Sequence, residues 1–225
     1  MASLKRSTVV LLACLLLPGG WSVHAQLLGS LPTRPDALMN AVTSEVLAIL
    51  KQDLAAGRPT NVSPLVEGKI VPLFDFQRMT SIAMARNWRL ASPEQQAALV
   101  IQFRTLLVRT YSASLAQHRD SQIQYRPLQS ARGDTEVLVR SFLRRSGAEP
   151  LSIDYAMHDS PAGWKVFDVT IAGVSLVLND RETFAAEVRS GGIDGLIKAL
   201  SDKNRLNEAA PNAGGPSGNR WSISS

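Results

Sequence analysis

Residues that could carry out acid–base, nucleophilic or metal chemistry are few in this sequence. Its 225 residues include 3 histidines (His24, His118 and His158) and 1 cysteine, Cys14. A zinc site takes about three or four closely placed ligands from His, Cys and carboxylate side chains. Neither His-Glu-x-x-His nor Cys-x-x-Cys, two spacings typical of zinc sites, occurs in the chain. We therefore expect no metal site and no resident cofactor.

Two polar residues near one predicted strand have patterns that could indicate catalysis. Ser175 follows a strand and a glycine, but Val177 stands where a nucleophile elbow has its closing glycine. We therefore predict that Ser175 caps the following helix. Asp168 lies within the apolar run Trp164–Ile171, where a carboxylate facing a cavity could act as a general base. We favour a structural carboxylate that accepts hydrogen bonds from backbone amides or an arginine.

The N-terminus has the pattern of a secretory signal peptide over residues 1–25. Lys5 and Arg6 precede an apolar stretch from Thr8 to Leu17, and Val23-His24-Ala25 forms a small-residue cleavage site. We expect cleavage after Ala25. The apolar stretch is much shorter than the roughly 20 residues of a membrane-spanning helix, which argues against an anchor.

Two further properties follow if the signal is removed. Loss of Lys5 and Arg6 lowers the formal net charge from +5 to +3, too little for an electrostatic nucleic-acid interface. Cys14 is also removed, unless Leu11–Cys14 acts as a lipoprotein cleavage box instead. An exported chain without cysteine has no disulfide, so its hydrophobic core must hold it together. We expect a soluble periplasmic protein, because no later stretch is apolar enough to span a membrane.

The rest of the chain predicts one domain over residues 34–205, between a leader at 26–33 and a disordered tail at 206–225. The tail is rich in Gly, Pro, Ser and Asn. Helical periodicity and start signals, including an N-cap at Asp75 and a capping box at Ser92–Gln95, predict helices in the first half of the domain. The four helices expected there are 35–56, 61–71, 76–88 and 93–117.

After residue 120 the apolar period changes from helical to alternating, which is typical of half-buried strands. The strands expected are 122–128, 135–144, 151–158 and 164–171, followed by helices over 174–188 and 193–204. This order predicts an α+β fold in which helices cover one face of a curved antiparallel sheet. Periodicity leaves open whether the apolar faces form a solid core or line a pocket.

Four ordered segments resemble the MlaC, or toluene-tolerance, family of periplasmic phospholipid-binding proteins of Gram-negative bacteria. The segments are Phe74–Thr80 with Arg86–Arg89, Phe103–Leu115, Trp164–Val177 and Gly191–Leu200, and the resemblance covers nearly all of residues 34–205. It implies an NTF2-like α+β fold that encloses an apolar pocket for acyl chains.

The resemblance also implies a non-enzymatic carrier, with phospholipid as cargo. Its expected partners are an outer-membrane MlaA-type lipoprotein complex and an inner-membrane ABC transporter, and its role is to maintain outer-membrane lipid asymmetry. We expect a monomer. Two alternatives are an NTF2-like enzyme that uses Asp168 with Tyr111 or His158 on a small substrate, and an interaction protein without a cavity.

The residues expected to line the pocket come from two sources. The family motifs indicate six positions on the long helix, the last full strand and the segment after it: Phe103, Leu107, Tyr111, Val166, Val174 and Leu176. Strand alternation adds five positions that share the inward face of two strands: Val137, Val139, Ile153, Tyr155 and Met157.

Overall fold

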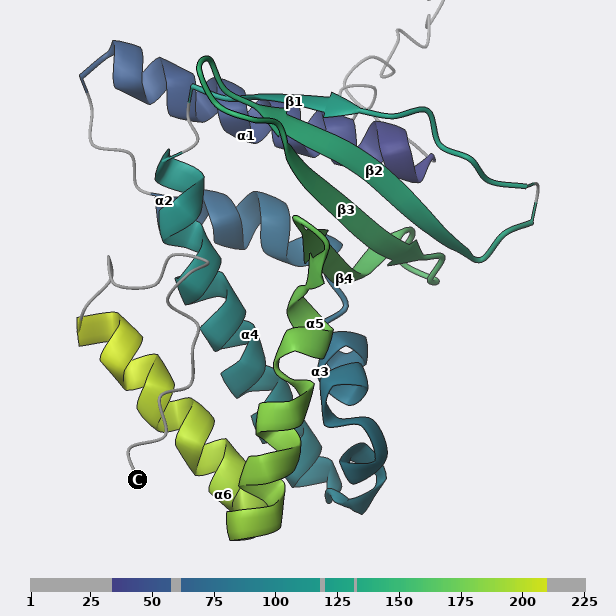
Figure 1. The fold of residues 1–225 in the computed structure, drawn as a ribbon, viewed down its shortest axis with the longest axis vertical. Coiled ribbons are helices and arrows are strands. Elements are labelled where there is room, and N and C mark those ends of the chain that lie inside the picture. Colours follow the sequence, from purple (N-terminus) through teal and green to yellow (C-terminus); the bar gives the residue numbers. More distant parts are fainter. Residues whose placement is uncertain (1–33, 58–61, 118–119, 132, 210–225) are drawn as a thin grey trace, which may run out of the picture. The chain divides into compact units, whose positions relative to one another are not determined.

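The computed structural model describes residues 34–57, 62–117, 120–131 and 133–209 (Figure 1). The predicted signal peptide, the leader, His118 and the chain beyond residue 209 lie outside these ranges. Within them, no helix is long and apolar enough to cross a membrane.

The first predicted helix is confirmed as α1, Pro35–Ala55, with proline in its first turn. The second predicted helix, 61–71, is confirmed as a helical segment, but it is not a regular α-helix, because the chain forms three consecutive short helical pieces there. These are α2 (Val62–Leu65), a π-helical turn η1 (Val66–Ile70) and a 3-10 turn η2 (Val71–Leu73). Gly68, a poor helix former, lies in the middle of this segment, and Pro72 has no N–H to donate the next helical hydrogen bond. A regular α-helix therefore does not continue through it.

The caps predicted for the two helices of the first half, at Asp75 and at Ser92–Gln95, are confirmed. Asp75 accepts a hydrogen bond from the Arg78 amide at 2.9 Å and begins α3, Phe76–Met84. The chain then turns into the 3-10 segment η3, Ala85–Leu90, where α3 was expected to continue, because Ala85 adopts a positive φ of 50°. Ser92 and Gln95 hydrogen-bond reciprocally, at 3.2 and 3.0 Å, and begin the 25-residue α4, Pro93–Gln117.

The strands form one antiparallel five-stranded meander in the order β1-β2-β3-β4-β5. Their bounds are β1 Gln122–Tyr125, β2 Glu136–Arg144, β3 Leu151–His158, β4 Lys165–Ile171 and β5 Val174–Ser175. A bulge in β4 shifts the register, since Met157 pairs with Val166 while Ala156 pairs with Asp168. Val166 and Val169 are therefore both buried, and Phe167 and Asp168 between them turn away from the interior.

The two C-terminal helices that were predicted are confirmed in part: residues 193–204 are helical and a kink at Gly192 falls in the predicted break, but the first helix begins later than expected. Val174–Ser175 pairs with β4 as β5, so the helix expected to begin at Val174 begins later, as α5, Leu176–Asn179. The last element, α6, runs from Arg181 to Ala209, past the start of the predicted tail at residue 206. Gly192 kinks α6 with φ 68° and ψ −171°.

Two hydrophobic clusters hold these elements together. The first joins α3, α4, α5 and α6, and α4 and α6 lie side by side (Figure 1). Phe103 of α4 meets Phe184 of α6 edge to face, with 5.2 Å between the ring centroids. The second cluster lies between α1, the 62–74 segment and the inner face of the sheet. The predicted α+β fold, a curved antiparallel sheet covered by helices, is confirmed.

Candidate functional site

An apolar cavity of about 280 Å³ lies between the inner face of the sheet, α1, α4 and the segment from η1 to α3. Its lining comes from elements between α1 and the start of α5, and α6 contributes none of it: Met39, Val42, Thr43, Val46, Leu47, Val66, Ile70, Val71, Leu73, Phe74, Phe76, Met79, Leu107, Val108, Tyr111, Ser112, Leu115, Ile123, Leu143, Leu151, Ile153, Tyr155, Val169, Ile171 and Leu176. None of these described residues carries a charge.

The hydroxyl groups of the lining are largely engaged with the protein itself. Thr43 Oγ1 donates to the Met39 carbonyl at 2.7 Å and lies 3.0 Å from the hydroxyl of Tyr125. Ser112 Oγ donates to the Val108 carbonyl at 2.6 Å. The wall therefore presents hydrocarbon to whatever occupies the cavity.

The two tyrosines of the lining do not supply a base or nucleophile near neutral pH. Burial raises the pKa of Tyr111 to about 12, with a smaller contribution from the charge of Asp180. Burial likewise raises the pKa of Tyr155 to about 12. Both phenols stay protonated at neutral pH. The cavity can hold a long apolar molecule, and among its described residues it has no group suited to proton transfer.

Asp168 is a structural carboxylate, as predicted. One of its oxygens accepts hydrogen bonds from the backbone amides of Val169 at 2.8 Å and Val177 at 3.3 Å. The other oxygen accepts from Ser175 Oγ at 2.6 Å. Ser175 in turn accepts from the Leu178 amide at 3.0 Å, which confirms it as the cap of α5. Asp168 is not part of the cavity lining.

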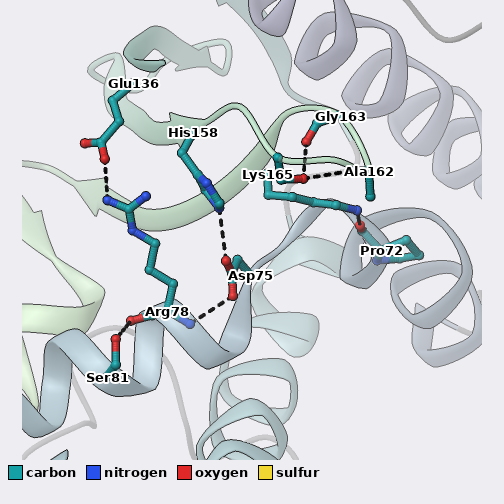
Figure 2. Close-up of polar contacts among 10 residues, drawn as sticks. Pro72, Asp75, Arg78, Ser81, Glu136, His158, Ala162, Gly163 and Lys165 are labelled. Atoms are coloured by element: carbon teal, nitrogen blue, oxygen red, sulfur yellow. Dashed lines mark hydrogen bonds and ion pairs between the residues drawn. The ribbon is translucent and has the colours of Figure 1, made fainter.

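His158, the last residue of β3, belongs to a second polar group, at one end of the sheet (Figure 2). Its Nε2 lies 3.0 Å from Asp75 Oδ2, the carboxylate that also caps α3. Arg78 of α3 binds Glu136 of β2 at 2.6 Å, and its guanidinium lies 3.8 Å from the ring centre of Phe167. These contacts fasten the start of α3 to the sheet, and neither His158 nor Asp75 lines the cavity.

Metal ligands do not gather in the part of the chain that the structure describes. No group of three or more His, Cys, Asp and Glu side chains there could hold an ion.

Comparison with known proteins decides the family. The MlaC protein family matches residues 40–202. The chain belongs to the MlaC family. The resemblance noted in the sequence is thereby confirmed.

Two individual proteins are similar to this chain. A phospholipid-binding protein from Ralstonia solanacearum, solved in complex with a phospholipid, is 40% identical with a TM-score of 0.68. That match covers 76% of this chain and 97% of the solved one. The intermembrane phospholipid transport system binding protein MlaC of Haemophilus influenzae is 20% identical over 173 residues, 75% of this chain and 81% of that protein.

Five of the residues predicted to line the pocket do lie at the cavity: Leu107, Tyr111, Ile153, Tyr155 and Leu176. Their contact with a ligand stays a prediction. Leu107 and Tyr111 are one turn apart on α4, and Ile153 and Tyr155 are alternate residues of β3, so each pair shares a face.

Four other predicted residues are fully or almost fully buried, but among side chains rather than at the cavity. Phe103 is one turn before Leu107 on α4 and packs in the helical cluster against Phe184. Val139, Met157 and Val166 are on the inner face of the sheet, where their exposed fractions are 0–1%. They fill the core in the half of the sheet nearer the end of β3 and are not among the residues at the cavity, so their contact with a ligand stays a prediction.

The remaining two predicted residues also lie elsewhere. Val174 is 54% exposed on β5, because the chain turns back on itself at Ala172–Gly173 and points this side chain outward. Val137 lines a different hollow, of mixed polarity, beside Trp164, Arg34 and Asp134. Neither residue is at the apolar cavity.

Sequence reasoning missed one whole wall of the MlaC cavity, formed by α1 and the 62–74 segment. Helical spacing had marked Val42 and Val46 as an apolar stripe, which was a usable signal. Nothing in that stripe showed which part of the sheet α1 would cover. The contribution of Val66 and Ile70 depends on the π-helical turn, which no local pattern predicted.

Proposed function

We propose that this protein is a periplasmic phospholipid carrier whose cavity holds acyl chains. The observation that carries the proposal is a cavity lined by uncharged, almost entirely apolar side chains in a chain of the MlaC family. The phospholipid bound by the Ralstonia relative, 40% identical to this chain, supports the same class of cargo.

Physical chemistry favours acyl chains in such a cavity. Removing a methylene group from water contributes about 0.8 kcal/mol, so two sixteen-carbon chains favour burial by on the order of 24 kcal/mol. The cavity of about 280 Å³ is small for a whole lipid, and Met39 and Met79 in its wall are side chains that adapt their shape readily. The phosphate head group stays at the rim, because an unpaired charge in this wall is costly.

A carrier of this kind passes lipid between membranes. We propose that the chain is exported by the signal peptide over residues 1–25 and shuttles as a monomer. Its partners are an MlaA-type lipoprotein complex at the outer membrane and an ABC transporter at the inner membrane, and the result is maintained outer-membrane lipid asymmetry. Support comes from the Haemophilus relative, described as part of an intermembrane phospholipid transport system.

The test is to express the full chain with its N-terminus, purify the exported protein, and measure its mass and its lipid. We expect a chain that begins at Gln26 and one phospholipid or more per protein after denaturing extraction and mass spectrometry. If no phospholipid can be extracted from the purified protein, the proposal that it is a phospholipid carrier is overturned. A chain that retains a lipidated Cys14 would overturn the proposed cleavage site.

Among the described residues, no arrangement of side chains favours the enzyme alternative. Asp168 accepts hydrogen bonds from two backbone amides and from Ser175. His158, at the end of β3, contacts Asp75. Tyr111 lines the cavity, but neither Asp168 nor His158 does. We therefore propose no catalytic role. Loaded protein incubated at neutral pH should return its phospholipid chemically unchanged.

A further inference from the structure

Three arginines share the outer face of β1 and β2 and its continuation past Tyr125. Arg140 and Arg144 are on the same face of β2, and Arg126 follows β1, where its amide donates to the Arg140 carbonyl at 2.9 Å. All three are exposed. Because alternate residues of a strand point to the same side, this face is opposite the one that lines the cavity. We call Arg126, Arg140 and Arg144 the arginine face.

The charge of the arginine face is mostly not neutralised. Within the described residues, none of the three forms an ion pair in the structure. Arg144 Nε donates to the uncharged Gln124 at 3.0 Å, and the Arg126 guanidinium lies 4.7 Å from the ring centre of Phe142. Asp154, which pairs with Arg140 across the sheet, offsets part of the charge. Glu136, at the start of β2, forms an ion pair with Arg78 instead.

No helix of the described chain covers this part of the sheet. Figure 1 shows α1 behind β1 and β2, with the opposite side of these strands bare. Leu138, on that bare side, is 42% exposed, and Phe142 is half-buried. Two scattered apolar side chains do not provide the desolvated hydrophobic centre that a stable protein–protein interface needs. The arginine face is therefore better suited to contact a hydrated, charged surface than to form an interface with another protein.

The side-chain chemistry indicates phosphate. All three cations are arginines, whose planar guanidinium groups bind phosphate oxygens in pairs. Arg140 and Arg144 are four residues apart on one strand, roughly 14 Å at about 3.4 Å per residue, and Arg126 is beside Arg140 on the neighbouring chain segment. The three arginines are therefore spread along one sheet face rather than gathered around a single point. An anionic bilayer offers a matching plane of phosphate groups.

We propose that the arginine face docks this protein on the surface of an anionic phospholipid bilayer. This goes beyond cargo binding, because the docking surface is on the opposite side of the sheet from the cavity and acts through head groups alone. Attraction to such a surface contributes roughly a fivefold gain in affinity for each arginine, hence on the order of 100-fold for three. Salt screens this attraction.

The experiment is vesicle sedimentation with the full protein. The probes are vesicles of equimolar phosphatidylcholine and phosphatidylglycerol, and vesicles of phosphatidylcholine alone. The test variant is R126Q/R140Q/R144Q. The matched control is R89Q/R181Q/R189Q, which removes the same charge from exposed arginines on η3 and α6. Lipid extraction from each purified variant measures cargo separately from docking.

We expect binding to the anionic vesicles at low salt, loss of binding at about 0.5 M salt, and little binding to phosphatidylcholine. The test variant should bind on the order of 100-fold more weakly while the control binds nearly as well as the parent chain. Both variants should retain their phospholipid, so failed docking and failed carriage give different results.

Three outcomes overturn the proposal. The parent chain could fail to bind anionic vesicles, the control could lose as much affinity as the test variant, or binding could be equal for both vesicle types. Loss of transfer to a purified protein complex in the test variant, without vesicle binding by the parent chain, would assign the face to an acidic protein instead.

Discussion

At the scale of single residues, Val139 and Ile153 separate the solid core from the cavity. They are on the inner face of adjacent strands, but Val139 is 1% exposed among core side chains, whereas Ile153 lines the cavity. A buried carboxylate without a partner costs several kcal/mol. We expect Val139→Glu to lower the free energy of unfolding by several kcal/mol or abolish folding. Ile153→Glu should fold, because water can hydrate its carboxylate in the cavity, and should purify without lipid.

Urea denaturation and lipid extraction of both variants check this pair. A Val139→Glu protein that is as stable as the parent and lacks lipid would show that Val139 lines the cavity. A loaded Ile153→Glu protein would show that acyl chains do not reach the inner face of β3.

The three tyrosines give the protein a predictable response to alkali. Burial raises the pKa of Tyr111 and Tyr155 to about 12 and also raises the pKa of Tyr125, from an unfolded value near 10. The unfolded chain therefore releases these protons first as pH rises. The stability they contribute is fully present below about pH 10 and is lost as pH rises to about 12. Tyrosinate absorbance and urea midpoints, measured together, should change over this window.

Lysines also titrate at alkaline pH, so the tyrosine contribution needs a control. Tyr111→Phe should remove one of the tyrosines that ionise at raised pH in the folded protein. It should also reduce the stability that the protein loses at alkaline pH. A parent protein whose tyrosines all ionise near pH 10 while it is still folded would contradict the described burial.

At the scale of elements, the kink in α6 depends on Gly192. Its φ of 68° and ψ of −171° are in a region that other residues rarely adopt, and no atom lies within 4 Å of the position that a Cβ would occupy there. Gly192→Ala should therefore lower the free energy of unfolding by about 1–3 kcal/mol through backbone strain alone. The kink lets Phe184 before it and Leu196 after it both reach the helical core.

Gly191 provides the matched control, because it is helical, has no positive φ, and also has open space where a Cβ would be. Gly191→Ala should leave the stability unchanged or raise it by up to about 1 kcal/mol. Equal effects of the two substitutions in chemical denaturation would show that α6 is not held in the kinked form.

At the scale of the whole molecule, cargo should stabilise the fold. A ligand that binds only the native state raises its stability, and each 1 kcal/mol shifts the Tm by about 2–4 °C for a chain of this size. We expect delipidated protein to melt several degrees below loaded protein, and added phospholipid to restore the Tm. Reductant should leave both values unchanged, because Cys14 is the single cysteine. Identical melts for loaded and delipidated protein would place the lipid outside the cavity.

Much of this fold is determined by signals that act within a few residues. The carboxylate of Asp75 and the Ser92–Gln95 box meet amides three positions away, so the starts of α3 and α4 can be predicted locally. Alternation likewise indicates the inner faces of β2 and β3, and Asp168 and Ser175 have the structural roles that their sequence context predicts. The family, too, follows from ordered motifs in the chain.

Only the tertiary structure decided which apolar residues line the cavity and which pack in the solid core. Phe103 and Leu107 are one turn apart with the same hydrophobic character, yet the first packs against Phe184 of α6 and the second faces the cavity. Val139 and Ile153 differ in the same way on adjacent strands. The hydrophobic effect favours removal of each side chain from water, whatever covers it. Whether the cover is a neighbouring side chain or a cavity depends on where distant helices cross the sheet, and no local pattern contains that position.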